Sequence, residues 1–198
     1  MMRMIHLGDL EVALPLAAAL GAWLVAAGAW RTALRWGLCF GAAVVLVGGS
    51  KIAFLGWGTG LAALEFKALS GHATVVTALY PMLAWVLLYR QGPAASRVGL
   101  ATGLGLGAVV AALLVVEGEH TGAEALGGWL LGAAVSLAGI ALSRELRTAR
   151  LLPGLWRSLP VFVVGAWLME SAHVGYWMVR VALALSGNSR PHAWDTCS

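Results

Sequence analysis

The chain has 198 residues, of which 60% are hydrophobic and only 11% charged, and its mean hydropathy is +0.83. Because a soluble domain carries roughly 25% charged residues, this composition excludes water as the main solvent of the chain. The net charge of +4 comes from arginines spread over separate loops, with no single basic stripe, so we expect no nucleic-acid partner.

Long apolar runs follow one another along the chain and leave no room for a separate soluble module. A bilayer core about 30 Å thick requires roughly 20 apolar residues of helix, and only helices or closed barrels satisfy the backbone there. The runs are continuous rather than alternating, which favours helices. We therefore predict an all-α polytopic membrane protein, a single domain over residues 1–198 with about six transmembrane helices. The predicted spans are 11–30, 37–57, 72–90, 97–116, 123–143 and 158–186, followed by a tail at 187–198.

The first run, 11–30, is predicted to be a retained helix rather than a secretory signal. It begins with Glu11, and it is followed by Arg31 and Arg35 rather than by a small-residue cleavage site. The two cysteines, Cys39 and Cys197, are too few for a disulfide framework.

Arginines indicate the orientation of the predicted bundle. If the six runs alternate, three loops on one side hold Arg31, Arg35, Arg90, Arg97, Arg144, Arg147, Arg150 and Arg157. The other side holds only Arg3, Lys67 and Arg190 outside the helices. The positive-inside rule assigns the arginine-rich loops to the cytoplasm and both termini to the outer side. We expect a multi-pass protein of a bacterial inner membrane. The side of the bundle that lacks the arginine-rich loops would face the periplasm.

Glycines recur within two of the predicted spans, at Gly103 to Gly107 and at Gly128 and Gly132. Small residues let transmembrane helices approach closely, so these positions predict helix–helix packing. The Gly103 to Gly107 segment follows no strand, which excludes a dinucleotide-binding loop.

Ionisable residues are costly inside a membrane, and here they gather at one depth on the outer side. Three regions contribute: the end of the second span, the start of the third and the start of the fifth. The residues concerned are Lys51, then Ser70, Gly71 and His72, then His120 and Glu124.

The spacing of His120 and Glu124 suggests a nucleophile. Residues four apart share a helical face, so Glu124 can hold one ring nitrogen of His120 and leave the other unprotonated. His72 can then act as a general acid on a leaving oxygen. Lys51, the Ser70 hydroxyl and the Gly71 amide can bind phosphoryl oxygens and stabilise developing charge.

These segments resemble those of the type 2 phosphatidic-acid phosphatase superfamily of membrane lipid phosphatases. That family has a Lys-x6-Arg-Pro segment, a Pro-Ser-Gly-His segment and a Ser-Arg-x5-His-x3-Asp segment. The resemblance implies an enzyme that hydrolyses a lipid phosphate without a metal or other cofactor. It implies a phosphohistidine on His120, with His72 as the general acid. The substrates implied include undecaprenyl diphosphate, phosphatidylglycerol phosphate, phosphatidic acid and the lipid A phosphates.

The chain departs from the family pattern at several positions. The family's Arg-Pro is Gly58 and Thr59, its proline is Leu69, its Ser-Arg is Leu113 and Leu114, and its aspartate is Glu124. Both phosphate-binding arginines are therefore absent, and guanidinium groups bind phosphate in a bidentate manner that other residues do not reproduce. The family also has three spans before its first catalytic segment, whereas two are predicted here, with one extra span at the end.

That extra span, 158–186, carries Glu170, His173, Tyr176 and Arg180 at spacings of three, three and four. On one continuous helix these residues share a face. Arg180, helped by Lys67, is the sequence-based hypothesis for a substitute phosphate clamp.

Other interpretations of the same residues stay open. The phosphoryl or head group could pass to an alcohol instead of water, or the chain could be a catalytically silent member that binds a lipid or a partner. Glu170, His173 and Arg180 could form a transporter relay. Glu117, Glu119, His120 and Glu124 could bind a metal. The sequence also leaves a homo-oligomer open.

Overall fold

The computed structural model describes residues 8–143, 146 and 151–192, and in these residues every regular element is helical. The helices are α2 (Leu10–Ala26), α3 (Trp30–Trp57), α4 (Gly71–Leu88), α5 (Pro93–Val116), α6 (Gly122–Ala141), α7 (Leu151–Glu170) and α8 (Val174–Ser186). Two short 3-10 turns, η2 (Ala62–Leu64) and η3 (Tyr89–Gln91), lie between them. The all-α prediction is confirmed.

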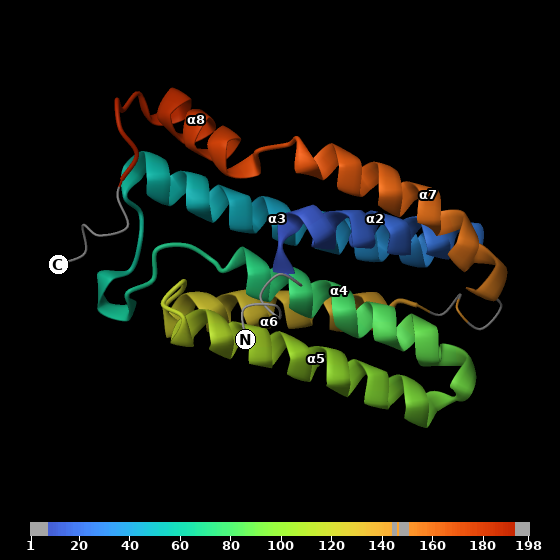
Figure 1. Ribbon diagram of the computed structural model, residues 1–198. Helices are drawn as coiled ribbons and strands as arrows, with labels where there is room; N and C mark the ends of the chain where they lie inside the picture. The colour runs from blue at the N-terminus through green and yellow to red at the C-terminus, as the bar shows by residue number, and fades with distance from the viewer. Residues whose placement is uncertain (1–7, 144–145, 147–150, 193–198) are drawn as a thin grey trace.

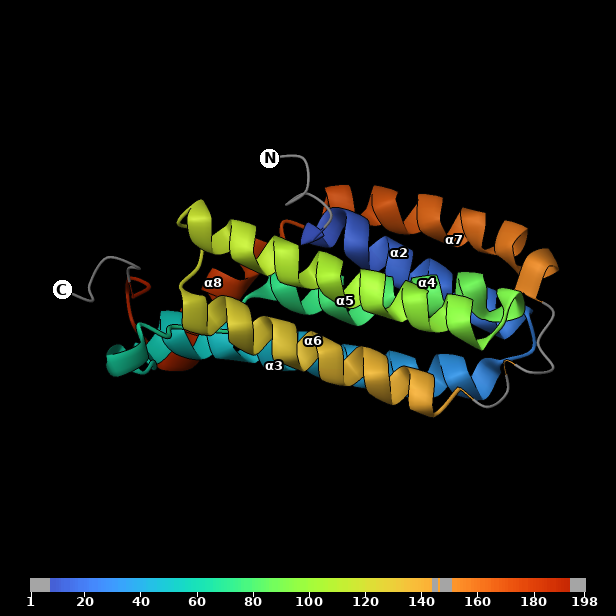
Figure 2. The ribbon, with the colours of Figure 1, turned by 90° about the horizontal axis from the view of Figure 1, so that it is seen from below.

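The helices run nearly side by side along one long axis (Figure 1). α4 packs against α5 and α6, α3 packs against α6 and α8, and α2 packs against α7. Figure 2 shows the same bundle from below, with α5 and α6 covering α4. α4 is the central helix, and Leu79 and Met82 on it are fully buried.

Among the described residues, four helices are long and apolar enough to cross a bilayer: Trp30–Trp57, Gly71–Gln91, Pro93–Val116 and Gly122–Ala141. α2 and α8 are apolar but shorter, at 17 and 13 residues. The prediction of a helical membrane protein is confirmed at this level. α3 begins at Trp30 and thus includes Arg31 and Arg35, which the predicted span 37–57 left out.

The last predicted span, 158–186, is wrong as a continuous helix. α7 ends at Glu170, and α8 begins at Val174 after His173, whose φ of 43° lies in the left-handed region. The Ser171 hydroxyl donates to Leu168 O, and His173 Nδ1 lies 2.7 Å from Ser171 O. Such local side-chain bonds to the backbone compete with helix continuation. Glu170, His173, Tyr176 and Arg180 therefore do not share one helical face.

Glycines allow the close packing that the sequence predicted. A Cβ atom on Gly103 would lie 2.5 Å from the Pro81 backbone, and one on Gly128 would lie 2.5 Å from Ser70 O. Gly132 and Gly107 likewise face Thr74 and Thr77 of α4, whereas Gly105 has open space beside it. Gly103, Gly107, Gly128 and Gly132 thus allow α5 and α6 to approach α4.

One end of the bundle, here called the arginine end, consists of the starts of α3 and α5 and the ends of α4 and α6. Arg31 and Arg35 begin α3 there, and Arg35 Nη1 donates to Leu142 O just after α6. Arg90 and Arg97 lie at the turn from α4 to α5. Arg3, Arg144, Arg147 and Arg150 lie outside the described residues, as does the tail from residue 193 to 198. The opposite end, the site end, contains the segments 58–70 and 117–121.

Candidate functional site

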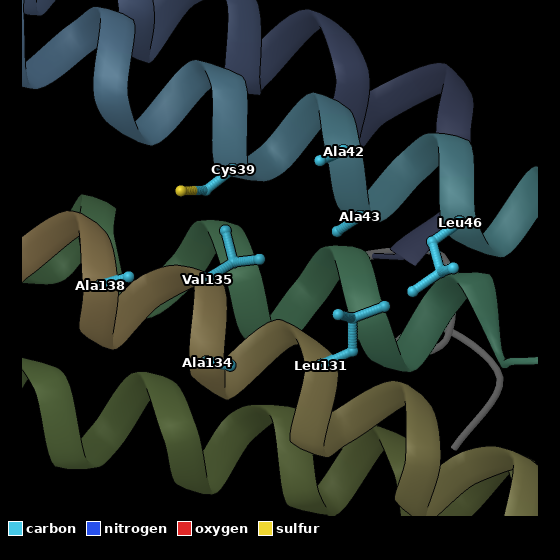
Figure 3. A pocket seen from close by; sticks show the side chains of 8 residues that line it. All are labelled: Cys39, Ala42, Ala43, Leu46, Leu131, Ala134, Val135 and Ala138. Atoms are coloured by element: carbon cyan, nitrogen blue, oxygen red, sulfur yellow. The ribbon is translucent and has the colours of Figure 1, made fainter.

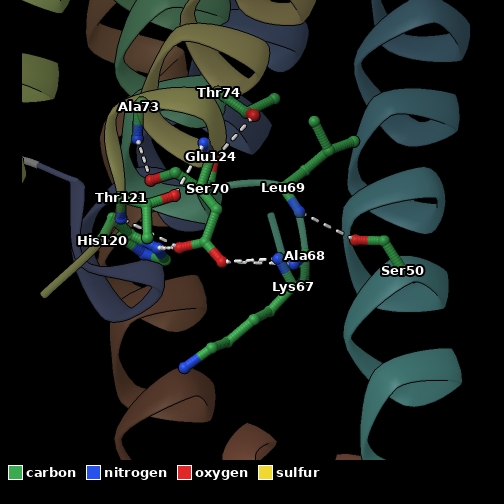
Figure 4. A network of polar contacts seen from close by, with 10 residues as sticks. All are labelled: Ser50, Lys67, Ala68, Leu69, Ser70, Ala73, Thr74, His120, Thr121 and Glu124. Atoms are coloured by element: carbon green, nitrogen blue, oxygen red, sulfur yellow. Dashed lines mark hydrogen bonds and ion pairs between the residues drawn. The ribbon is translucent and has the colours of Figure 1, made fainter. Parts of the chain in front are cut away.

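The site end brings together the starts of α4 and α6. Ser70 N donates to Glu124 O at 3.2 Å, which joins the residue before α4 to the first turn of α6. Leu69 N donates to the Ser50 hydroxyl of α3 at 3.2 Å, so the segment before α4 is also attached to α3 (Figure 4). Three elements that are distant in sequence therefore converge, as predicted.

His120 and Glu124 form the most buried pair in this cluster. His120 Nδ1 lies 2.9 Å from Glu124 Oε2, and the two side chains are 9% and 2% exposed. His120 does not itself lie on the helix, as the spacing had suggested, because α6 begins at Gly122. The contact forms because the carboxylate of Glu124 turns back over the helix start.

A capping box explains this turn of the Glu124 side chain. Glu124 N donates to the Thr121 hydroxyl at 3.4 Å, and Thr121 N donates to Glu124 Oε2 at 3.2 Å. The Thr-x-x-Glu spacing is the sequence signature of such a box. Thr121 was missed in the sequence analysis, although this signal was present.

The other carboxylate oxygen of Glu124 holds the segment before α4. Oε1 accepts from Lys67 N at 2.9 Å and from Ala68 N at 3.4 Å (Figure 4). Glu124 thus accepts four hydrogen bonds in a position almost closed to solvent. Its carboxylate connects the nucleophile candidate to the loop between α3 and α4.

The protonation of His120 follows from its surroundings. An ionised carboxylate only accepts hydrogen bonds, so Nδ1 carries the proton and Nε2 keeps its lone pair. Burial lowers the pKa of His120 below its ordinary value of 6.5, and nearby Lys51 and His72 lower it further, while Glu124 raises it. The balance favours neutral His120, which is the nucleophilic form.

Lys51 lies beside the first residue of α4. A Cβ atom on Gly71 would be 3.8 Å from Lys51 Nζ, so the absent side chain leaves space next to the ammonium group. The charge of Lys51 also acts on both His120 and Glu124. The structure therefore brings Lys51, Gly71, His72, His120 and Glu124 to one cluster.

His72 has a partner that the sequence analysis missed. Its Nε2 lies 3.0 Å from Asp9 Oδ1, and the side chains are 33% and 34% exposed. Gly8 allows this approach, because a Cβ atom there would lie 2.9 Å from His72 Cβ. Asp9 precedes α2 and looks like an ordinary N-cap residue in sequence, so no local signal pointed to a residue 63 positions away.

The Ser70 side chain caps α4 and is not open to a substrate. It is fully buried and accepts from Ala73 N at 3.4 Å. The Ser70 backbone carbonyl accepts from Thr74 Oγ1 at 2.7 Å. These contacts assign Ser70 to the start of the helix that carries Gly71 and His72, and the hydroxyl does not face solvent.

The predicted clamp residues Lys67 and Arg180 differ in their relation to the cluster. Lys67 contributes its backbone N–H to Glu124, while its side chain points away from that carboxylate (Figure 4). Arg180 is exposed on α8, where Nη1 donates to the Tyr176 hydroxyl at 3.0 Å and the guanidinium faces the Tyr176 ring. In the described residues the contacts of Arg180 are with Tyr176 on its own helix, and α8 packs against α3 after the helix break.

The acidic residues of the alternative metal site separate in space. Glu117 and Glu119 are exposed, whereas His120 and Glu124 face each other. No group of three or more metal-binding side chains of the His, Cys, Asp and Glu types occurs in the described ranges. The four residues of the metal interpretation thus do not converge in this structure.

An apolar groove lies between α3 and α6, on the arginine-end side of the cluster. It has a volume of about 290 Å³ (Figure 3). Its lining consists of Cys39, Ala42, Ala43 and Leu46 of α3 and Leu131, Ala134, Val135 and Ala138 of α6. The same two helices carry Lys51 and Glu124, which lie nearer the site end than the groove does.

Comparisons with known proteins identify similarity to a protein of undefined activity. No protein-family model matches the chain, and no solved structure matches it. It is similar to an uncharacterized 22.5 kDa protein in the cps region of Klebsiella pneumoniae, with 37% identity over 139 residues. The match covers 70% of this chain and 66% of that protein, slightly under two thirds of its length.

Proposed function

We propose that this protein is an integral membrane phosphatase that hydrolyses a lipid phosphate or diphosphate through a phosphohistidine on His120. The observation that carries the proposal is the buried His120–Glu124 pair, with His72 and Lys51 in the same cluster. A buried imidazole that is held by a carboxylate through one nitrogen is a prepared nucleophile at the other. The residues of the three segments that resemble those of the lipid phosphatase family thus lie near one another, although they come from separate regions of the chain.

The proposed reaction has two steps. In the first, His120 Nε2 attacks the terminal phosphorus, and the bond to the leaving oxygen breaks; that oxygen belongs to the lipid alcohol or, in a diphosphate, to the lipid monophosphate. His72 gives that oxygen its proton. In the second, water attacks phosphorus, the phosphorus–nitrogen bond breaks, and His72 takes the proton back from the water. The products are a lipid alcohol, or a lipid monophosphate from a diphosphate, and inorganic phosphate.

In this proposal, phosphate is bound by the Lys51 ammonium group and by the start of α4, both beside His120. Lys51 Nζ lies against Gly71, and the first N–H groups of α4 face an anion favourably because of the helix dipole. This pair compensates in part for the two motif arginines that the chain lacks. A single ammonium group binds phosphate as a point charge, without the bidentate geometry of a guanidinium.

The hydrocarbon part of the substrate fits the groove between α3 and α6. Leu46 lies five residues before Lys51 on α3, and Leu131 lies seven residues after Glu124 on α6. At about 1.5 Å per residue, the groove begins roughly 8–10 Å from the polar cluster. A phosphate at His120 would therefore direct an attached chain along these apolar residues.

The proposal includes a membrane topology. We propose six crossings, in which α2 forms the first and α7 with α8 forms the last, broken at Ser171 to His173. α2 would extend about 25 Å, at the short end of what a bilayer core requires. The arginine end would lie in the cytoplasm and the site would open toward the periplasmic side of an inner membrane.

Phosphate release by the purified protein tests the function. Wild type, His120→Ala and His72→Ala would be compared on phosphatidic acid, phosphatidylglycerol phosphate and undecaprenyl diphosphate, each with and without a chelator. His173→Ala is the matched control, because His173 lies at the break between α7 and α8, where its Nδ1 contacts Ser171 O. We expect release by wild type and the control, loss in both other variants, and no effect of the chelator. Release from none of these lipids contradicts the proposal, and loss with the chelator favours metal-dependent chemistry.

A groove variant tests the lipid assignment separately. Ala42→Trp adds a large side chain inside the groove, and Val45→Trp adds the same side chain on the exposed surface of α3. We expect Ala42→Trp to raise KM for a long-chain phosphatidic acid but not for its dihexanoyl form. Equal effects of the two variants on both substrates would contradict the location of the chain in this groove.

A further inference from the structure

Asp9 occupies a position where a carboxylate ordinarily accepts hydrogen bonds from the first turn of its own helix. It is the N-cap residue of α2, and its backbone carbonyl accepts from Val12 N and Ala13 N at 3.0 and 2.9 Å. Aspartate is among the best N-cap residues because its side chain can accept from the first turn. Among the described residues, however, its side chain makes no capping hydrogen bond.

The carboxylate instead lies against His72, 63 residues further along the chain. The distance from Asp9 Oδ1 to His72 Nε2 is 3.0 Å, and Gly8 has no side chain to obstruct the approach. A position that omits a favourable local contact and makes a distant one often marks a functional constraint. The pair also repeats the arrangement of His120 with Glu124, a carboxylate on one nitrogen of each imidazole.

We propose that Asp9 is a positioning residue that orients His72 as the proton donor of the reaction. This inference rests on the proposed function. Asp9 fixes the plane of the imidazole and occupies Nε2, so that Nδ1 is the nitrogen left to face the leaving oxygen. When His72 gives up its proton, it does so from Nδ1, and Nε2–H stays bound to Asp9.

The other charged groups near His72 do not take over this role. His120 interacts with His72 electrostatically, but its Nδ1 is held by Glu124. Lys51 is a cation and cannot accept a hydrogen bond. Asp9 is therefore the carboxylate that the described contacts assign to His72, just as Glu124 is the one assigned to His120.

The dependence on the leaving group separates positioning from a general structural role. A dodecyl phosphate must release an alkoxide and needs a proton donor. A 4-octylphenyl phosphate releases a phenolate, whose conjugate acid has a pKa near 10 as in tyrosine, and needs the donor much less. Wild type, Asp9→Asn, Asp9→Glu and His72→Ala would be assayed on both substrates, with Glu11→Gln as a control that removes an exposed carboxylate two residues away.

We expect Asp9→Asn to slow dodecyl phosphate hydrolysis about 10- to 100-fold and 4-octylphenyl phosphate hydrolysis less than about threefold. Asp9→Glu should restore part of the rate, and Glu11→Gln should behave like wild type. Asp9→Asn combined with His72→Ala should be no slower than His72→Ala alone, because a residue that acts through His72 has no effect without it.

Three results would overturn the inference while leaving the function in place. The first is an equal loss of rate on the two substrates in Asp9→Asn, and the second is a slower rate in the double variant than in His72→Ala. The third is a higher rate in Asp9→Asn than in wild type, which would mean that Asp9 competes with phosphate for His72. Wild type that releases phosphate from neither substrate would overturn the proposed function itself, and with it the role of Asp9.

Discussion

Replacing Glu124 with glutamine keeps the size of the side chain and removes its charge. The carboxylate accepts four hydrogen bonds, from Lys67 N, Ala68 N, Thr121 N and His120 Nδ1. A glutamine has one acceptor oxygen, so at most two of these donors keep a partner and the other two face an NH₂ group. An unsatisfied buried donor costs about 1–3 kcal/mol. We expect Glu124→Gln to lose about 2–4 kcal/mol of stability, since the Ala68 bond is long.

The effect on activity depends on which way the glutamine turns. If its NH₂ group faces His120, Nδ1 must accept and the proton moves to Nε2, so the nucleophilic lone pair is lost. If its oxygen faces His120, the two amides of Lys67 and Ala68 lose their acceptor and the loop before α4 loosens. The first case removes the nucleophile and predicts a loss of about 10²–10⁴-fold in kcat. Both cases lower the thermal midpoint by about 2–4 °C per kcal/mol at this chain length.

Thermal unfolding in detergent and phosphate release would be measured on the same preparations. Glu124→Asp is the informative partner variant, because it keeps the charge and moves it back by one methylene; it should keep more activity than Glu124→Gln. Glu119→Gln, an exposed glutamate in the same loop, is the control. Unchanged unfolding and an unchanged rate in Glu124→Gln would refute the assignment of this carboxylate as the hub of the site.

Other outcomes follow from the same structure. Burial lowers the pKa of His120 below 6.5, so its neutral form persists to lower pH, and the acid limb of kcat/KM should lie below pH 6.5; a limb above that value would contradict the assignment. Gly103→Ala should lower the thermal midpoint because its Cβ would meet Pro81, whereas Gly105→Ala, in open space on the same helix, should leave it unchanged or raise it slightly, and equal shifts would refute the packing argument. Lys51→Ala should slow phosphate release at least about tenfold, with partial recovery in Lys51→Arg, whereas Arg180→Ala should change it less than about threefold. A larger loss in Arg180→Ala would restore the sequence-based clamp hypothesis.

Long apolar runs predicted the helices because a bilayer leaves the backbone few alternatives. The bounds of α4, α5 and α6 agree with the predicted spans to within a few residues. The break after Glu170 was not predicted, because it depends on side-chain bonds of Ser171 and His173 to nearby carbonyls and on the packing of α8 against α3. Hydropathy alone carries no information about such a break.

The site was predictable where its contacts are local in sequence and unpredictable where they are not. His120 and Glu124 lie four residues apart, and their spacing alone indicated the pair. Asp9 reaches His72 only because the packed bundle brings the start of α2 beside the start of α4, as Figure 1 shows. The predicted position of Arg180 likewise depended on non-local structure, because it assumed one continuous last helix that α7 and α8 do not form.

The central claim, a phosphohistidine on His120, can be tested by trapping the intermediate. Purified protein would be mixed with a ³²P-labelled lipid phosphate, quenched within milliseconds in alkali, and mapped by mass spectrometry. We predict a label that survives alkali, is released by acid, lies on His120 and is absent in His120→Ala. Turnover of the substrate with no such label, or with a label on another residue, would contradict the account.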